Sequence, residues 1–305
     1  MSQDREPTAV EGRLIGAHLE LLQHAWGPHD RPLYNHAVLC STSLPYRNPG
    51  DDVRKWGRTN GRASLLLEAG SIPDPKGKGW KPVGLPYGPR ARLVLLHLCS
   101  EAVKTQSPVV EVQRSFTAFA RELGLANGGR NLRTLRDQTV RMAVVGMRIA
   151  VRHSTHIDQY QGPVFRRLEV AYNEEPQLSL WGSVVEFSEG FYTSLRESAV
   201  PLRREAIGAL KHSAMALDVY VWLAYRLWRV KTPVRLRWDV LQAQFGRPEH
   251  HARSFRRRFR KALSQALMAY PEAKVDVEAE GLKLYQSAPP VPEKWLDRPE
   301  LGLLR

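Results

Sequence analysis

The spacing of apolar and polar residues becomes regular only after the first 84 residues. Before that point the pattern predicts one short helix, Leu14 to Leu22, and the chain beyond it is interrupted by seven prolines. Two short strands, Ser64 to Glu68 and Trp80 to Val83, flank the turn-rich segment 73–77 and are expected to pair as a β-hairpin. We interpret residues 1–84 as an N-terminal arm that carries this hairpin.

From residue 85 the pattern predicts a series of regular elements. An apolar helix is followed by a strand, by a short helix between a possible N-cap, Ser115, and Gly124, and by a longer helix. The predicted helices are Arg92–Val103, Phe116–Leu123 and Arg130–Met147, and the predicted strands are Val109–Val112, Ile149–Arg152, Val164–Tyr172 and Ser183–Phe187.

A similar order recurs nearer the C-terminus. Its first helix is apolar on nearly every side, which predicts a central, buried position. An alternating strand, a short helix closed by Gly246, a long helix stopped by Pro271 and a β-hairpin follow. The predicted helices are Leu217–Val230, Val240–Phe245 and Ala252–Tyr270, and the predicted strands are Val234–Trp238, Lys274–Val277 and Leu282–Gln286.

The repeated order is helix, strand, short helix, long basic helix and β-hairpin, which is the winged-helix arrangement. The predicted fold class is therefore α+β, with two tandem winged-helix domains and an N-terminal arm that carries a β-hairpin. We place the first domain at 85–200, the second at 201–290 and a C-terminal tail at 291–305. Chance similarity between two ordinary α+β domains is the alternative.

The chain is strongly basic, since 45 lysines and arginines against 31 aspartates and glutamates give a net charge of +14. This charge favours a polyanionic partner. The two cysteines, Cys40 and Cys99, form no CxxC pair, which argues against a disulfide framework and a cysteine-rich zinc site. No signal peptide or membrane span is expected, so we predict a cytoplasmic protein.

Much of the excess charge lies in the long helix of the second predicted domain. Residues 247–261 hold seven basic residues and one glutamate, a local charge of +6. The basic side chains share one arc, with Phe255 and Phe259 on the other. Such a face suits a recognition helix in the major groove, although a solvated helix surface is the alternative. The candidate DNA contacts are His250, Arg253, Ser254, Arg256, Arg257, Arg260 and Lys261.

The long helix of the first predicted domain is a weaker candidate for DNA binding. Asp137 lowers its charge, and an ordinary amphipathic helix explains its pattern equally well. Positive residues at the start of a wing are also candidates for a backbone contact. The candidates from this domain are Arg130, Arg133, Thr134, Gln138, Arg141 and Arg152.

Motifs for catalysis are missing from the sequence. Gly77-Lys78 is followed by Gly79, which does not match a P-loop. His153 and His156 do not have the spacing of the adjacent histidine ligands in a nicking relaxase. We therefore expect a DNA-binding protein that is not an enzyme and has no catalytic or metal-binding residues. A rolling-circle nicking protein is the alternative from the enzyme class.

Several longer stretches are more specific than any short motif. They are HAVLCSTSLPYRNPG from His36, GLPYGPRAR from Gly84, GGRNLRTLRDQ from Gly128 and AMALDVYVWLAY from Ala214, with the segments 105–112, 241–246 and 255–259. These stretches resemble the plasmid-encoded RepA replication initiators, and the similarity covers about residues 33–290.

The resemblance implies binding to direct repeats (iterons) at a plasmid origin, opening of the adjacent duplex and recruitment of the host initiator and replicative helicase. Related initiators also form homodimers through the first winged-helix domain. The resemblance implies no cofactor, and it carries DNA contacts onto Arg130, Arg133, Arg141, Arg253, Arg256, Arg257, Arg260 and Lys261. We predict a plasmid replication initiator. A sequence-specific transcriptional repressor without an origin role is the alternative.

Overall fold

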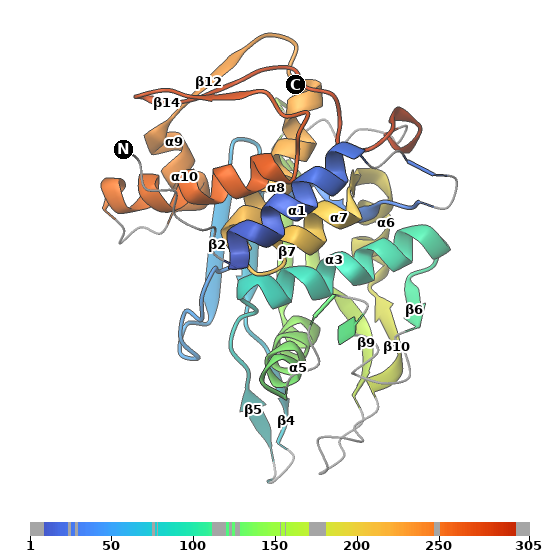
Figure 1. Cartoon of the computed structure of the whole chain (residues 1–305). Helices are drawn as coiled ribbons and strands as arrows, with labels where there is room; N and C mark the ends of the chain where they lie inside the picture. The colour runs from blue at the N-terminus through green and yellow to red at the C-terminus, as the bar shows by residue number, and fades with distance from the viewer. Residues whose placement is uncertain are drawn as a thin grey trace. The chain divides into compact units, whose positions relative to one another are not determined.

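The structure of the chain is a computed structural model with a mixed α/β fold (Figure 1). It describes residues 9–296 except 24–25, 28–29, 75–76, 78, 112–119, 122–123, 126–128, 153, 156, 171–180 and 247–250. The chain divides into two compact units: the first unit is Leu33–Pro201, and the second unit is Leu202–Leu296 with the described residues of Met1–Pro32. Within the described ranges, no helix is long and apolar enough to cross a membrane.

The second unit is built around α8 (Ala214–Arg226). Almost every side chain from Ala214 to Tyr225 is buried, which confirms the prediction of a central helix. Ser213 caps α8 by accepting a hydrogen bond from the Ala216 amide at 3.3 Å. The other helical elements of this unit are α1 (Ala9–Gln23), α7 (Arg204–Leu210), η1 (Leu227–Arg229), α9 (Trp238–Phe245), α10 (Ala252–Met268) and η2 (Glu293–Trp295).

The strands of the second unit form one antiparallel sheet. Strands β12 (Val234–Arg237), β13 (Val275–Val277) and β14 (Gly281–Leu284) lie in the order β12-β14-β13. A Cβ at Gly281 would overlap the carbonyl oxygen of Leu236, so the close approach of β12 to β14 requires glycine there. The predicted C-terminal hairpin is therefore confirmed, with shorter strands than expected.

The first unit is built around a buried helix and several small sheets. Helix α3 (Gly88–Thr105) is its buried helix, and Gln106, in the left-handed conformation with φ 54°, ends it. The other helices among the described residues are α2 (Ala37–Ser41), α5 (Gly129–Val144) and α6 (Glu189–Ser198). The strands are β1 (Leu33–His36), β2 (Lys55–Asn60), β3 (Ala63–Glu68), β4 (Ser71–Pro73), β5 (Trp80–Pro82), β6 (Val109–Glu111), β7 (Gly146–Arg152), β8 (Ile157–Pro163), β9 (Phe165–Val170), β10 (Trp181–Phe187) and β11 (Ala199–Leu202).

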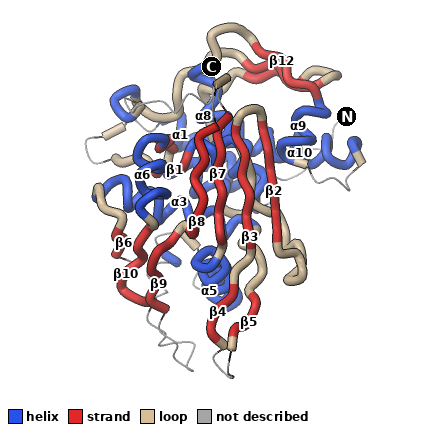
Figure 2. Tube along the Cα trace, turned by 180° about the vertical axis from the view of Figure 1, so that it is seen from behind, coloured by secondary structure: helices blue, strands red, loops and turns tan. Residues whose placement is uncertain are grey.

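Four strands of the first unit lie side by side in the order β2-β3-β7-β8 (Figure 2). A second sheet has the order β6-β10-β9, and β4-β5 and β1-β11 are two-stranded pairs. In the large sheet, Leu65 and Leu67 of β3 lie opposite Ile149 and Met147 of β7, and all four side chains are buried. The matching alternation on the two strands explains why they pair.

This pairing corrects two predictions. The strands expected at 64–68 and 80–83 do not pair with each other, because β3 pairs with β2 and β7 whereas β5 pairs with β4. The strand expected at 149–152 is part of β7 and therefore belongs to the four-stranded sheet, not to the β9–β10 hairpin. Alternating hydrophobicity locates a strand and its buried face, but it does not say which strand is the partner.

The expected N-terminal arm is divided between the two units. Helix α1 belongs to the second unit, where the His18 Nδ1 lies 2.8 Å from the carbonyl oxygen of Met268. Residues from Leu33 onward contribute to the core of the first unit, in which Val38 and Leu67 are fully buried. Residues 1–84 therefore do not form one separate arm.

Candidate nucleic-acid interface

An aromatic cluster in the second unit holds α10 in place. The Phe259 ring lies 5.5 Å from Phe255, 5.3 Å from Phe245 and 6.1 Å from Trp238, measured between ring centroids. Phe245 in turn packs edge-on against Trp222 of α8 at 5.3 Å. All of these rings are buried, so one face of α10 is anchored to α8 and α9.

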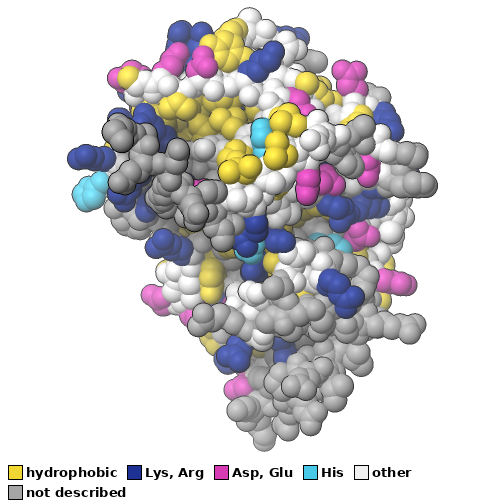
Figure 3. Space-filling model, in the orientation of Figure 1, with side chains coloured by type: hydrophobic (Ala, Val, Ile, Leu, Met, Phe, Trp, Pro, Cys, Tyr) yellow, Lys and Arg dark blue, Asp and Glu magenta, His cyan; other side chains and the backbone are white. Residues whose placement is uncertain are grey.

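The opposite face of α10 is cationic and exposed. The side chains of Arg253, Arg256, Arg257, Arg260 and Lys261 are all exposed, and Ser254 is half-buried. Among the residues that the structure describes, no carboxylate lies within 4.0 Å of these five cations. Figure 3 shows basic side chains on the left of the molecule, the side on which Figure 1 draws one end of α10. The two-faced helix expected from the sequence is therefore confirmed, and its charge is available to an anionic ligand.

Trp238 connects this cationic face to the hairpin β13–β14. The guanidinium groups of Arg256 and Arg260 lie over its indole ring, 5.8 and 5.2 Å from the centroid. The indole Nε1 donates a 2.8 Å hydrogen bond to the carbonyl oxygen of Ala279, in the turn between β13 and β14. Arg256 and Arg260 thus have a fixed aromatic support, whereas no such ring lies against Arg253, Arg257 or Lys261 in the described residues.

The sheet of the second unit carries charges that largely neutralise each other. Arg235 on β12 forms an ion pair with Glu278 at 3.2 Å, and Arg237 forms one with Asp239 at 3.3 Å. Asp276 accepts a 2.7 Å hydrogen bond from the Tyr285 hydroxyl. The excess positive charge of this unit is therefore concentrated on α10 and not on its hairpin.

Helix α5 of the first unit presents fewer of its predicted contacts. Arg133 and Thr134 are exposed, while the side chain of Arg130 lies outside the described residues. Gln138 and Arg141, by contrast, are only 1% and 8% exposed. The expectation that all five share one accessible face is wrong for Gln138 and Arg141.

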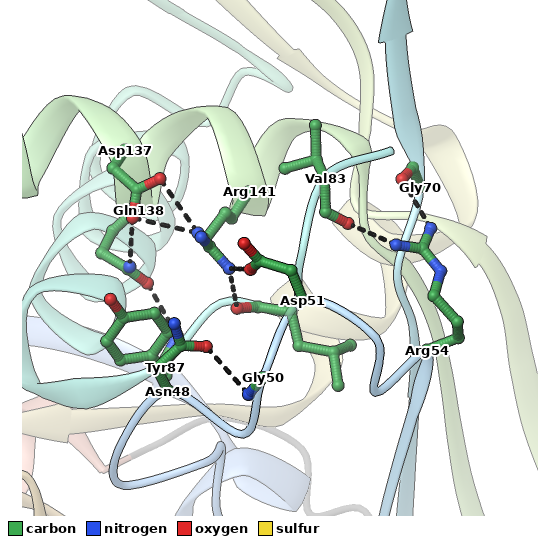
Figure 4. A network of polar contacts seen from close by, with 11 residues as sticks. Asn48, Gly50, Asp51, Arg54, Gly70, Val83, Tyr87, Asp137, Gln138 and Arg141 are labelled. Atoms are coloured by element: carbon green, nitrogen blue, oxygen red, sulfur yellow. Dashed lines mark hydrogen bonds and ion pairs between the residues drawn. The ribbon is translucent and has the colours of Figure 1, made fainter. Parts of the chain in front are cut away.

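A network of polar contacts explains why these two side chains are buried (Figure 4). Arg141 contacts Asp137 and Asp51 at 3.0 Å each and donates to the carbonyl oxygen of Leu85 at 3.3 Å. The Gln138 amide oxygen accepts a 2.7 Å hydrogen bond from the backbone amide of Tyr87, and its nitrogen donates to Asp137 at 2.9 Å. Both side chains hold α5 to the preceding loops, so we leave them out of the interface.

The electrostatics of this network favour the charged arginine. Burial acts to lower the pKa of Arg141, but its hydrogen bonds and charge interactions with Asp137 and Asp51 outweigh that effect, and the pKa is raised. The Arg141 guanidinium also lies 5.3 Å from the centroid of the Tyr87 ring. Burial, followed by the nearby charge of Asp137, raises the pKa of Tyr87. The network therefore acts as a structural ion cluster.

Two further residues, Arg152 and His250, were also predicted to contact DNA. Arg152 is exposed, but it ends β7, and its backbone amide donates to the carbonyl oxygen of Arg62 at 2.9 Å. It therefore lies in the four-stranded sheet and not at the start of the β9–β10 hairpin. His250 lies outside the described residues.

Comparison with models of known protein families shows to which family this chain belongs. Residues 85–239 match the family described as "Plasmid encoded RepA protein". The chain belongs to this family. The resemblance seen in the sequence is thus confirmed. No curated protein matches this RepA-family chain at a significant level.

Two solved structures are similar to this RepA-family chain at low sequence identity. One is the crystal structure of RctB domains 2–3, with a TM-score of 0.48, 11% identity, and coverage of 78% of this chain and 83% of that chain. The other is a selenomethionine derivative of domains 2 and 3 of RctB, with a TM-score of 0.46, 12% identity, and coverage of 91% and 100%.

The match to the RepA family includes α5 and ends at Asp239, before α10 begins. The role of α10 therefore has to be argued from its own geometry. The sequence pattern predicted Trp238 as the end of the strand Val234–Trp238, whereas it begins α9, and the pattern did not predict its contacts with Arg256 and Arg260. The only signal for them was an aromatic residue next to the basic strand Val234–Arg237, which does not indicate a partner on another helix.

Proposed function

We propose that this RepA-family protein is a plasmid replication initiator that binds double-stranded DNA at the origin. The observation that carries the proposal is the exposed cationic face of α10, which has no carboxylate within 4.0 Å among the described residues and is held by buried phenylalanines on its other side. Arginines on a helix can bind phosphates and can recognise guanine in the major groove. Arg253, Arg256, Arg257, Arg260 and Lys261 would make these contacts.

We further propose that both units are winged-helix domains. In the second unit, α8, β12, α9, α10, β13 and β14 follow one another in the winged-helix order, with the sheet order β12-β14-β13. The first unit has an equivalent sheet order, β6-β10-β9, which supports the same assignment. There the hairpin β7–β8 is inserted between α5 and β9 and pairs with β3 instead.

Two different DNA-reading helices in one chain would suit directly repeated sites. The faces of α10 and α5 differ, so the pair would recognise a site that has a direction, as an iteron does. If the two units bind as the halves of a helix-turn-helix dimer do, the two half-sites would lie about 10 bp apart. Duplex opening would draw on binding and bending energy and on the host initiator and helicase, partners that the family resemblance suggests.

We extend the proposal to how the protein works. It would act as a binding protein and not as an enzyme, and it would dimerise through the first unit when it is not at the origin. Cleavage of a single-stranded origin oligonucleotide in the presence of a divalent metal would contradict the first statement. A concentration-independent monomer by sedimentation would contradict the second.

A replication assay tests the initiator role directly. The gene is supplied in trans to a plasmid that carries the DNA flanking the gene but no initiator gene of its own. We expect this plasmid to replicate with the wild-type protein and to fail with the R257A/R260A variant. If the wild-type protein represses a promoter in that DNA but the plasmid never replicates, the protein is a transcriptional repressor and the initiator proposal is wrong.

A further inference from the structure

A short hairpin of the first unit carries the most exposed aromatic residue among the described large apolar side chains. Strands β4 and β5 pair in the register Ser71 with Pro82, Ile72 with Lys81 and Pro73 with Trp80. The Trp80 side chain is 72% exposed, although tryptophan is normally mostly buried in a folded protein. Packing within the chain therefore does not explain this residue.

The base of this hairpin is rigidly built. The Arg54 guanidinium donates to the carbonyl oxygens of Val83 at 2.9 Å and Gly70 at 2.8 Å (Figure 4). It also donates to the carbonyl oxygen of Ala69 at 2.6 Å. The Val83 amide also donates to Gly70 at 3.0 Å, which closes the two strands at that end. A two-stranded hairpin is only marginally stable by itself, so these hydrogen bonds of Arg54 stabilise the hairpin and fix its orientation within the unit.

The hairpin edges are unsuited to pairing with another strand. Pro73 on β4 and Pro82 on β5 have no backbone N–H, and prolines on an edge block the addition of a further β-strand. A partner must therefore meet the side chains of the hairpin and not its backbone. Trp80 is the largest of those side chains.

The charge of the hairpin indicates which partner fits. Residues 74–82 contain three lysines and one aspartate, a net charge of +2, and Lys81 beside Trp80 is exposed. An exposed indole next to an exposed lysine is suited to a base that stacks on the ring while the ammonium group of Lys81 meets a phosphate. If the partner were an uncharged protein surface, positive charge on the hairpin would not strengthen the binding.

The hairpin lies next to the candidate DNA-reading helix of the same unit. A Cβ at Gly70 would overlap the carbonyl group of Val144, the last residue of α5, so the hairpin base touches the end of that helix. In both Figures 1 and 2 the β4–β5 hairpin extends beyond α5. DNA that binds the exposed residues of α5 would therefore run close to the hairpin.

We propose that the β4–β5 hairpin is an additional nucleic-acid contact in which Trp80 stacks on a base and Lys81 binds the adjacent phosphate. This inference rests on the proposed DNA-binding function, and it adds a contact at the end of α5 that the two reading helices do not include. The base can come from a single strand or from a step of the duplex that the indole wedges open.

The test measures the affinity of the full-length protein for two fluorescent probes, a single-stranded oligothymidylate of about 20 nucleotides and a mixed-sequence duplex of the same length. We expect W80A to weaken binding about tenfold or more, and W80F, which keeps a stacking ring, to weaken it by about threefold or less. Ile157→Ala is the matched control, because Ile157 is also an exposed apolar residue, at 57%, on another hairpin of the first unit.

The pattern of losses decides between the outcomes. A loss confined to the single strand supports stacking on unpaired bases, and a loss confined to the duplex supports a wedge. Equal affinities of W80A and wild type on both probes, or an equal loss in I157A, would overturn the inference while leaving the proposed function intact. A wild-type protein that binds neither probe would overturn both.

Discussion

The two long basic helices, α10 and α5, contain similar kinds of residues but hold them in different environments. On α10, five cationic side chains are exposed, and aromatic rings fill the space beneath the helix. On α5, Asp137 lies four residues before Arg141 and pairs with it, and Asp51 from a loop completes the ion cluster. A helix with several exposed arginines is suited to binding an anionic ligand, whereas an arginine paired with carboxylates stabilises the fold.

The two units should differ first in their response to acid. His36 of the first unit is fully buried, its Nε2 lies 2.9 Å from the Ser194 hydroxyl, and burial lowers its pKa from 6.5 to about 3. The unfolded chain binds this proton near pH 6.5 and the folded chain does not. The free energy of unfolding should therefore fall by about 1.4 kcal/mol per pH unit between about pH 6.5 and 3.

Urea unfolding at pH 7 and pH 5 measures this effect. The loss of stability in the wild type should exceed that in His36→Gln by about 2 kcal/mol. Equal losses in both proteins would show that His36 does not cause the acid sensitivity.

The next largest effect should come from the cations of α10. The R257A/R260A variant should bind duplex DNA at least about tenfold more weakly, because two phosphate or base contacts are lost. The slope of log K against log salt, expected to be steeper than about −4 for the wild type, should become shallower by about 2. Both quantities come from anisotropy titrations at several salt concentrations. An unaltered slope would place the DNA on another face.

For α5, the comparison predicts that loss of the buried arginine affects the stability of the protein and not its DNA affinity. Arg141→Ala should destabilise the protein by about 1–3 kcal/mol, because Asp137 and the Leu85 carbonyl lose a buried partner. Arg133→Ala, on the exposed face of the same helix, should change stability by less than about 0.5 kcal/mol. Chemical denaturation gives both values. If Arg141→Ala kept its stability and lost DNA affinity, the structural role assigned to Arg141 would be wrong.

The smallest effect should separate the cations of α10 from one another. Trp238→Phe keeps a ring under Arg256 and Arg260 but removes the hydrogen bond to Ala279. We expect the ratio of specific to non-specific DNA affinity to fall about threefold while the salt slope stays the same. Trp228→Phe is the control, because that ring lies against Arg229 instead, at 4.1 Å. A similar change in both variants would remove the special role of Trp238.

Local patterns in the sequence were sufficient for much of the second unit. The buried helix α8, the two faces of α10 and the hairpin β13–β14 all follow from spacings within one element or one turn. The family was also recognisable from the sequence, because long stretches such as those from Gly128 and Ala214 are specific to it.

Only the tertiary structure decided which distant segments meet. The pairing of β3 with β7, the burial of Gln138 and Arg141 against Tyr87 and Asp51, and the contact of Trp238 with Arg256 all join residues far apart in the chain. Periodicity reports the direction in which a side chain points from its own element. It does not report what lies there, because that depends on the packing of the other elements.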